Sequence, residues 1–138
     1  MASIAMAQAL PIVQAAIVAR LAPLVGLDAQ GLPRCYWQRA PIAADVQPDP
    51  GTIVFQSQDR GGREEAYLGA CGWAGLIAIK VYATQADRVD ALLGQVEAAM
   101  AGIVAGTGQL SIVGVAPLTL PVDRGEAAGL LYSLTLMP

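Results

Sequence analysis

Residues 75–103 read GLIAIKVYATQADRVDALLGQVEAAMAGI and join a strand pattern to a helix pattern. The first nine residues alternate between two faces, and this period of two predicts a β-strand. One face would carry Ile77, Ile79, Val81 and Ala83, and the other Leu76, Ala78, Lys80 and Tyr82. The period then changes to the three-and-four spacing of an amphipathic helix. The buried stripe of that helix would consist of Val89, Leu92, Leu93, Val96, Met100 and Ile103.

The two ends of this helix carry signals of their own. Thr84 stands where an N-cap belongs, and Asp87, three residues later, makes an approximate capping box near the positive end of the helix dipole. Gly102 is expected to end the helix, because glycine adopts the left-handed conformation without steric penalty. A strand that leads directly into such a helix, with strands on either side of the pair, indicates an α+β or mixed α/β layer.

The chain before this stretch contains one more expected helix and two expected strands. Residues 9–25 predict the helix, with Pro11 in its first turn and Pro23 near its end. Strands are expected at 34–38 (RCYWQ) and 52–57 (TIVFQS). The segment between these strands reads as a surface loop, because prolines cannot join a central ladder. Its proline and aspartate residues are Pro41, Asp45, Pro48, Asp49 and Pro50.

The chain after this stretch is expected to close the sheet with two strands, at 109–115 and 129–137. Pro117, Pro121 and the residues that follow them predict a loop between these strands. The length of 138 residues indicates one domain, 1–138, that is long enough to bury a core without metal or disulfide support.

The composition favours a subunit of a larger assembly. Hydrophobic residues make up 55% of the chain and charged residues 14%, whereas a typical domain has about 25% charged residues. Such a chain has little charge with which to cover its surface, so we expect part of that surface to be covered by another subunit. A monomer with an alanine-rich surface is the alternative. The net charge of −3 and the scattered basic residues argue against a module that grips nucleic acid through its phosphates.

The N-terminal segment and the cysteines predict a soluble, intracellular protein. No Lys or Arg precedes the apolar run of residues 1–25, and Arg20 interrupts it, which fits neither a signal peptide nor a membrane span. Cys35 and Cys71 are expected to be reduced and partly buried rather than paired in a disulfide.

The most charged segment is residues 58–72, QDRGGREEAYLGACG. One interpretation is a solvated hairpin tip between the strand at 53–56 and the strand at 75–83. The other is a flexible arm that docks on a partner. A phosphate-binding loop is disfavoured, because the Gly61-Gly62 pair is not followed by the Gly-Lys-Ser/Thr ending and has no dinucleotide-type spacing.

The residue types that carry most catalysis are missing or isolated. The chain has no histidine, which removes the commonest general base and most zinc sites. Asp87, Asp90 and Glu97 are expected on the solvated side of the helix, and a cation site at Asp45 and Asp49 is disfavoured. The aromatic residues are expected to be core or interface anchors. They are Tyr36, Trp37, Trp73 and Tyr82. We therefore expect no enzyme, no cofactor and no metal.

The order of these elements resembles that of the tail terminator, or tail completion, proteins of tailed bacteriophages and related particles. The resemblance rests on the TIVFQS segment at 52–57, the long strand LIAIKVYAT at 76–84 and the helix that follows it from Ala86. It spans nearly the whole chain as a pattern of elements with few fixed residues. The long alanine-rich N-terminal helix and the low charge depart from the family pattern.

The resemblance implies a single α+β domain with a mixed, mainly antiparallel sheet of four to five strands flanked by two helices. It implies a closed homo-oligomeric ring, of about six copies, that caps the tail tube, stops its polymerisation and meets the head-side connector. DNA would be only passing cargo in the lumen, no membrane would be involved, and the location would be the virion tail or neck after assembly in the host cytoplasm. Rival interpretations are another neck or head-completion adaptor and, from a different class, a small ligand-binding regulatory α+β domain.

A heterologous ring needs two different patches on each subunit. We expect the charged arm to supply one patch and the exposed face of the strand at 75–83 to supply the other. The candidate interface residues are Arg60, Arg63, Glu64, Glu65, Tyr67, Lys80 and Tyr82.

Overall fold

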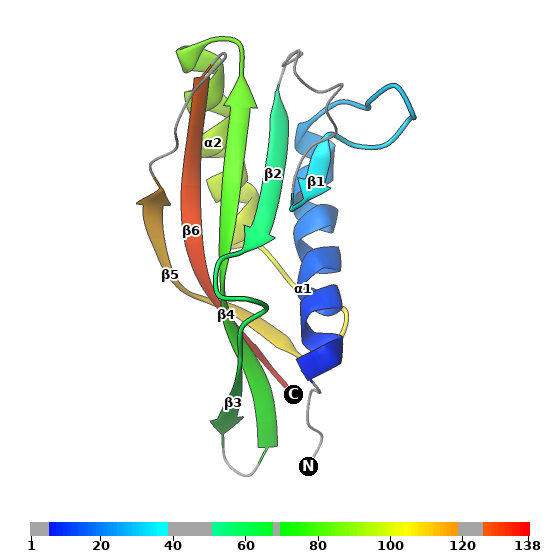
Figure 1. The fold of residues 1–138 in the computed structure, drawn as a ribbon, viewed down its shortest axis with the longest axis vertical. Helices are drawn as coiled ribbons and strands as arrows, with labels where there is room; N and C mark the ends of the chain where they lie inside the picture. Colours follow the sequence, from blue (N-terminus) through cyan, green and yellow to red (C-terminus); the bar gives the residue numbers. More distant parts are fainter. Residues whose placement is uncertain (1–5, 39–50, 68–69, 119–125) are drawn as a thin grey trace.

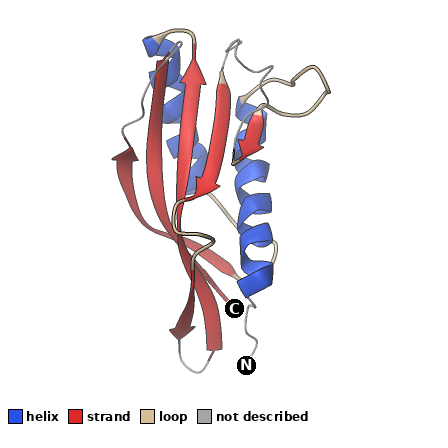
Figure 2. Ribbon diagram, viewed as in Figure 1, coloured by secondary structure: helices blue, strands red, loops and turns tan. Residues whose placement is uncertain are grey.

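A computed structural model describes residues 6–38, 51–67, 70–118 and 126–138. Two helices lie against one face of a six-stranded sheet, and the opposite face is not covered by either helix (Figure 1, Figure 2). The elements in chain order are α1 (Met6–Leu21), the short 3-10 helix η1 (Ala22–Leu24), β1 (Cys35–Trp37), β2 (Thr52–Ser57), β3 (Arg63–Tyr67), β4 (Ala70–Ala83), α2 (Ala86–Ala101), β5 (Gln109–Leu118) and β6 (Glu126–Met137).

The sheet is organised around β4, its longest strand. The strand order is β1-β2-β4-β6-β5, and β3 pairs with β4 beyond the end of β2. The β1–β2 pair is parallel and the other pairs are antiparallel. The expected α+β fold with a mixed, mainly antiparallel sheet and two helices is therefore confirmed, with one strand more than the four to five expected.

The core lies between the helices and the inner face of the sheet, which we define as the face that the helices cover. The alternation expected at residues 75–83 is confirmed, because Ile77, Ile79 and Val81 are fully buried on this face. The helix stripe is confirmed as well, with Val89, Leu92, Val96 and Met100 buried and Leu93 packed at the edge of the core. From β6, the core receives Leu130, Tyr132, Leu134 and Leu136.

Helix α1 starts earlier than expected, so Pro11 lies inside the helix and not in its first turn. Pro11 is exposed, and α1 packs with Val13, Ile17 and Leu21 into the core. By length and composition, the window 7–24 is apolar enough to cross a membrane, with a mean hydropathy of 1.4. Core helices of soluble proteins, which are mostly buried, and signal sequences near an N-terminus meet the same criterion; 28% of this window is buried inside the fold.

The caps of α2 differ from the expected ones. Gln85, not Thr84, is the N-cap residue, and it makes no side-chain capping hydrogen bond. Gly102 ends the helix as expected, but its φ of −101° is not left-handed. Its N–H still reaches the carbonyls of Ala99 and Met100, so the last turn is closed without the conformation that only glycine favours.

The C-terminal strands are longer than expected. β5 runs to Leu118 and so includes Pro117, which was expected in a loop; proline is tolerated there because β5 is an edge strand. A register shift between Ile112 and Gly114 leaves Val113 as an extra residue. The expected loop at 39–50, with Asp45 and Asp49, and most of the loop after Pro117 lie outside the described residues.

Candidate subunit interface

The face of the sheet opposite the helices, which we call the outer face, carries mainly uncharged side chains. Because side chains alternate along a strand, this face receives Leu76, Ala78, Lys80 and Tyr82 from β4. Their neighbours on the same face include Val54 and Gln56 of β2 and Leu131 and Ser133 of β6. Ala78 and Val54 are buried, whereas Leu76, Lys80, Tyr82 and Leu131 are partly exposed. Lys80 is the one charged side chain that the described parts of β2, β4 and β6 place on this face.

A shallow groove of about 230 Å³ lies on the outer face, toward the end of the sheet where β3 pairs with β4. Arg63 and Glu65 of β3 line one side of it, and Val113 of β5 lines the other. The floor is made by β4 and β6 residues, namely Ala74, Gly75, Leu76, Ser133, Leu134 and Thr135. Arg63 and Glu65 form an exposed ion pair, with 3.7 Å between Nε and Oε2. Such a pair contributes little to stability, so both charges remain available to a partner.

The segment 58–72 forms a hairpin between β2 and the rest of β4, in line with the first interpretation of its charge, although its charged residues lie in a strand and not in a loop at the tip. Residues 58–62 form a turn between β2 and β3, and the charged residues Arg63, Glu64 and Glu65 lie in β3 itself. Both β2 and β3 pair with the same edge of β4, so this turn interrupts what would otherwise be one long strand. The β3–β4 hairpin extends beyond β2 at the lower end of the molecule (Figure 1).

Hydrogen bonds fix the turn at 58–62 firmly to β4. The Leu76 N–H donates to Asp59 Oδ2 over 3.1 Å, and the Ser57 hydroxyl donates to Asp59 Oδ1 over 3.2 Å. Ser57 Oγ in turn accepts from the Gly61 N–H at 2.7 Å, and the buried Trp73 indole donates to the Gly61 carbonyl at 2.6 Å. The turn at 58–62 is therefore held against the core by its hydrogen bond to the buried Trp73.

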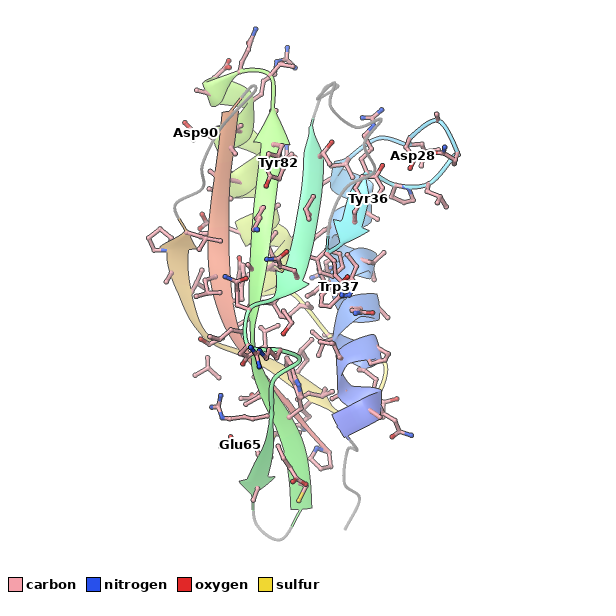
Figure 3. The ribbon with its side chains drawn as sticks, viewed as in Figure 1. Asp28, Tyr36, Trp37, Glu65, Tyr82 and Asp90 are labelled. Atoms are coloured by element: carbon pink, nitrogen blue, oxygen red, sulfur yellow. The ribbon has the colours of Figure 1, made fainter. Side chains whose placement is uncertain are left out.

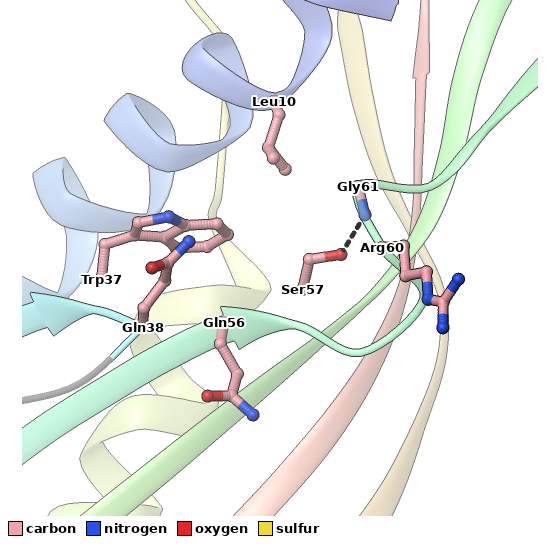
Figure 4. Close-up of a pocket in the computed structure, with 7 residues that line it drawn as sticks. All are labelled: Leu10, Trp37, Gln38, Gln56, Ser57, Arg60 and Gly61. Atoms are coloured by element: carbon pink, nitrogen blue, oxygen red, sulfur yellow. Dashed lines mark hydrogen bonds between the residues drawn. The ribbon is translucent and has the colours of Figure 1, made fainter.

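An open pocket of about 440 Å³ lies beside this turn, between α1, β1 and β2 (Figure 4). Leu10 of α1 and Trp37 of β1 form its apolar walls, and Ser57 and the Gln38 amide add polar groups. The Arg60 side chain points away from Trp37 and Leu10 in this view. The Trp37 ring meets Phe55 edge-on, with 5.2 Å between the ring centroids.

Two residues on the rim of this pocket have strained backbones. Gln38 and Arg60 have φ of 71° and 58°, in the left-handed region that costs a side-chain-bearing residue about 1 kcal/mol or more. The described residues contain no other non-glycine residue with positive φ. Backbone strain of this kind accumulates at binding sites, where the surrounding structure holds it in place.

The structure separates the candidate interface residues into several places (Figure 3). Arg63 and Glu65 share the groove, while Tyr82 lies near the opposite end of the molecule from Glu65. Lys80 lies between these ends on the outer face, and Arg60 is on the rim of the pocket. Six residues of strand, about 20 Å, separate Leu76 in the groove from Tyr82. The Tyr67 side chain is outside the described part.

Glu64 points to the other face of β3 and affects a cysteine. The Glu64 carboxylate accepts a hydrogen bond from Cys71 and raises the pKa of that thiol, with its negative charge as a second cause. Cys35 lies on β1, where burial raises the pKa of its thiol to about 12. Cys35 and Cys71 form no disulfide, and both are partly buried, as expected.

Sequence reasoning missed the pocket and the part that Val113 plays in the groove. The pocket combines residues 10, 37, 57 and 61, whose separation in the chain gives no local signal. Within the ranges that the structure describes, no three His, Cys, Asp or Glu residues come together in a way that could hold a metal ion. No protein-family model matches this chain, and no curated protein is found to be related to it.

Proposed function

We propose that this protein is a structural subunit of a tailed bacteriophage or related particle, which assembles into a closed ring of about six copies. The ring caps the tail tube, ends its polymerisation and joins it to the head-side connector. In this proposal the protein is not an enzyme, the other copies and the two neighbouring rings are its partners, and DNA only passes through the lumen.

The observation that carries this proposal is the outer face of the sheet. Partly exposed Leu76 and Leu131 lie there, and in the described parts of β2, β4 and β6 Lys80 is the one charged side chain on this face; the Arg63–Glu65 ion pair of β3 lies at its end. Neither helix covers it (Figure 2). A face with so little charge is suited to contact with another protein rather than to permanent exposure to water.

The order of the elements adds support from the sequence. The segment at 52–57, the long β4 strand and helix α2 follow one another as in the tail terminator family that the chain resembles. A neck or head-completion adaptor would use the same kind of surface. Binding of the purified ring to tail tubes, as opposed to portal rings, separates the two.

Native mass spectrometry, combined with negative-stain microscopy, tests the proposal. The wild-type chain is expected to give the mass of about six copies and annular particles. The double variant Leu76→Glu/Leu131→Glu places two carboxylates on the outer face and is expected to be a folded monomer by circular dichroism. Ala98→Glu, on the exposed side of α2, is the matched control and should keep the ring. A wild-type chain that stays monomeric at every concentration and in the presence of tail tubes would refute the proposal.

A second candidate function is a small ligand-binding regulatory domain, and the pocket of about 440 Å³ favours it. Its volume is within the range of small-molecule sites, and Trp37 offers an aromatic wall. The element order does not match the βαββαβ order of ferredoxin-like domains. A screen of metabolites by thermal shift tests this candidate, because a ligand that binds only the folded state raises the Tm.

A further inference from the structure

The outer edge of β5 has hydrogen-bonding groups that no described strand pairs. β5 is the last strand of the sheet and has β6 as its one strand partner in the described chain. It contains no charged residue, and Val113 and Val115 are 68% and 49% exposed. Edge strands of soluble proteins usually carry charges that prevent pairing with another chain. Two features of β5 hinder such pairing, the bulge at Val113 and the proline at 117. Both lie after its first half, Gln109–Ile112, so they do not prevent pairing of that half.

On the opposite side of the sheet, the outer edge of β3 has no strand partner among the described residues either, and it lies at the same level. The pairing registers align Glu64, Trp73, Leu136 and Leu110 in one row across β3, β4, β6 and β5. The adjacent row joins Arg63, Ala74, Thr135 and Ser111. The outer edge of β3 and the first half of β5 are therefore the two ends of the same rows of residues.

The strand directions also suit a contact between copies. Each of the β3–β4, β4–β6 and β6–β5 pairs is antiparallel, so β5 runs opposite to β3. When identical copies repeat side by side without displacement along the strands, β3 of one copy meets β5 of the next in antiparallel orientation. Antiparallel pairing is the more stable arrangement per residue and needs no rearrangement of either strand.

We propose that β3 of one copy pairs with the first half of β5 of the next copy, so that the sheets continue around the ring. This inference rests on the proposed ring and specifies its contact. The contact is heterologous, which closes a ring when the rotation between copies allows it. On the outer face, Arg63 of one copy would lie beside Ser111 of its neighbour, and both side chains are exposed in the single chain.

A charge-swap series measured by native mass spectrometry tests this pairing. Ser111→Lys would place an ammonium beside the neighbour's Arg63, and we expect the ring mass to be lost to the monomer mass because like charges across a strand pair repel. Ser111→Glu, the matched control, faces the same arginine with the opposite charge and should keep the ring. Adding Arg63→Glu to Ser111→Lys should restore the ring mass.

Hydrogen–deuterium exchange supplies a second measurement that does not depend on a variant. Backbone amides of residues 109–112 should exchange more slowly in the wild-type ring than in the chain diluted to monomers, whereas residues 27–33 should not change. The strand pairing would be overturned, and the ring proposal left intact, by two results together. The Ser111→Lys variant would keep the ring mass, and residues 109–112 of the wild-type ring would show no added protection. A wild-type chain that forms no ring would overturn both.

Discussion

The two faces of the same sheet differ in what they contain. The inner face holds large side chains that are fully buried, such as Phe55, Ile77 and Tyr132, and both helices pack on it. The outer face holds small or neutral side chains that stay partly exposed, such as Leu76 and Ser133. Because the strands alternate, each β4 residue that builds the core is followed by one that faces outward. The low charge of the chain is thus partly a property of the outer face, which neither helix covers (Figure 2).

Adjacent residues of β4 make the sharpest test of this difference. Ile77→Ala on the inner face should lower the free energy of unfolding by about 2–5 kcal/mol, because it leaves a cavity in a packed core. Leu76→Ala, its matched control on the outer face, should cost about 1 kcal/mol or less in the isolated chain. Urea unfolding of both variants, at concentrations where the chain is monomeric, measures the two values. Equal costs would mean that the outer face is packed within the subunit, contrary to our description.

The tyrosines of the two faces provide a test by pH. Burial, with the charge of Glu97 as a second cause, raises the pKa of Tyr132 to about 12, while burial also raises the pKa of Tyr82 on the outer face. The unfolded chain ionises its tyrosines near pH 10, so the stability due to neutral Tyr132 is complete below pH 10. It should be lost as the pH rises toward 12, by roughly 2–3 kcal/mol.

Chemical unfolding between pH 9 and pH 12 measures this loss, since this range extends from below the tyrosine pKa of the unfolded chain, near 10, up to the pKa of Tyr132 in the folded chain, about 12. Tyr132→Phe should abolish the loss that belongs to this residue, and Tyr82→Phe should keep it. If the two variants behave alike, the inner face does not protect its tyrosine more than the outer face does.

A smaller effect on the free energy of unfolding is expected at the turn of residues 58–62, which joins β2 to β3. Asp59→Ala removes the acceptor for the Leu76 N–H and for the Ser57 hydroxyl, and it should cost about 1–2 kcal/mol in unfolding free energy. Asp59→Asn keeps one acceptor oxygen and should cost less. Thermal unfolding followed by tryptophan fluorescence compares them. No loss in Asp59→Ala would show that Trp73 and Gly61 hold the turn without the carboxylate.

The elements that sequence reasoning predicted well are those with strong periodic patterns. The strand at 52–57 and the helix from Ala86 were predicted with the observed bounds or nearly so, because their apolar residues repeat on one face over the whole element. Lys80 and Tyr82 were placed on the exposed face of β4 for the same reason, and the structure agrees.

The errors arise where tertiary pairing overrides local preference. The segment REEAY looks like loop because of its charges, yet as an edge strand it can keep those charges in water while its backbone pairs with β4. Pro117 was expected to end a strand, although an edge position removes the cost of its missing N–H. The pocket could not be predicted, since Leu10, Trp37 and Ser57 meet only in the folded chain.

The position of β4 in the middle of the sheet has a consequence for synthesis of the chain on the ribosome. Its longest partner is β6, which pairs with it from Trp73 to Ala83 and belongs to the end of the chain. The ribosome needs several seconds to add the roughly 50 residues that separate these strands. During that time one edge of an apolar strand has no intramolecular partner, so chaperones or rapid docking of α2 would have to shield the nascent chain from aggregation.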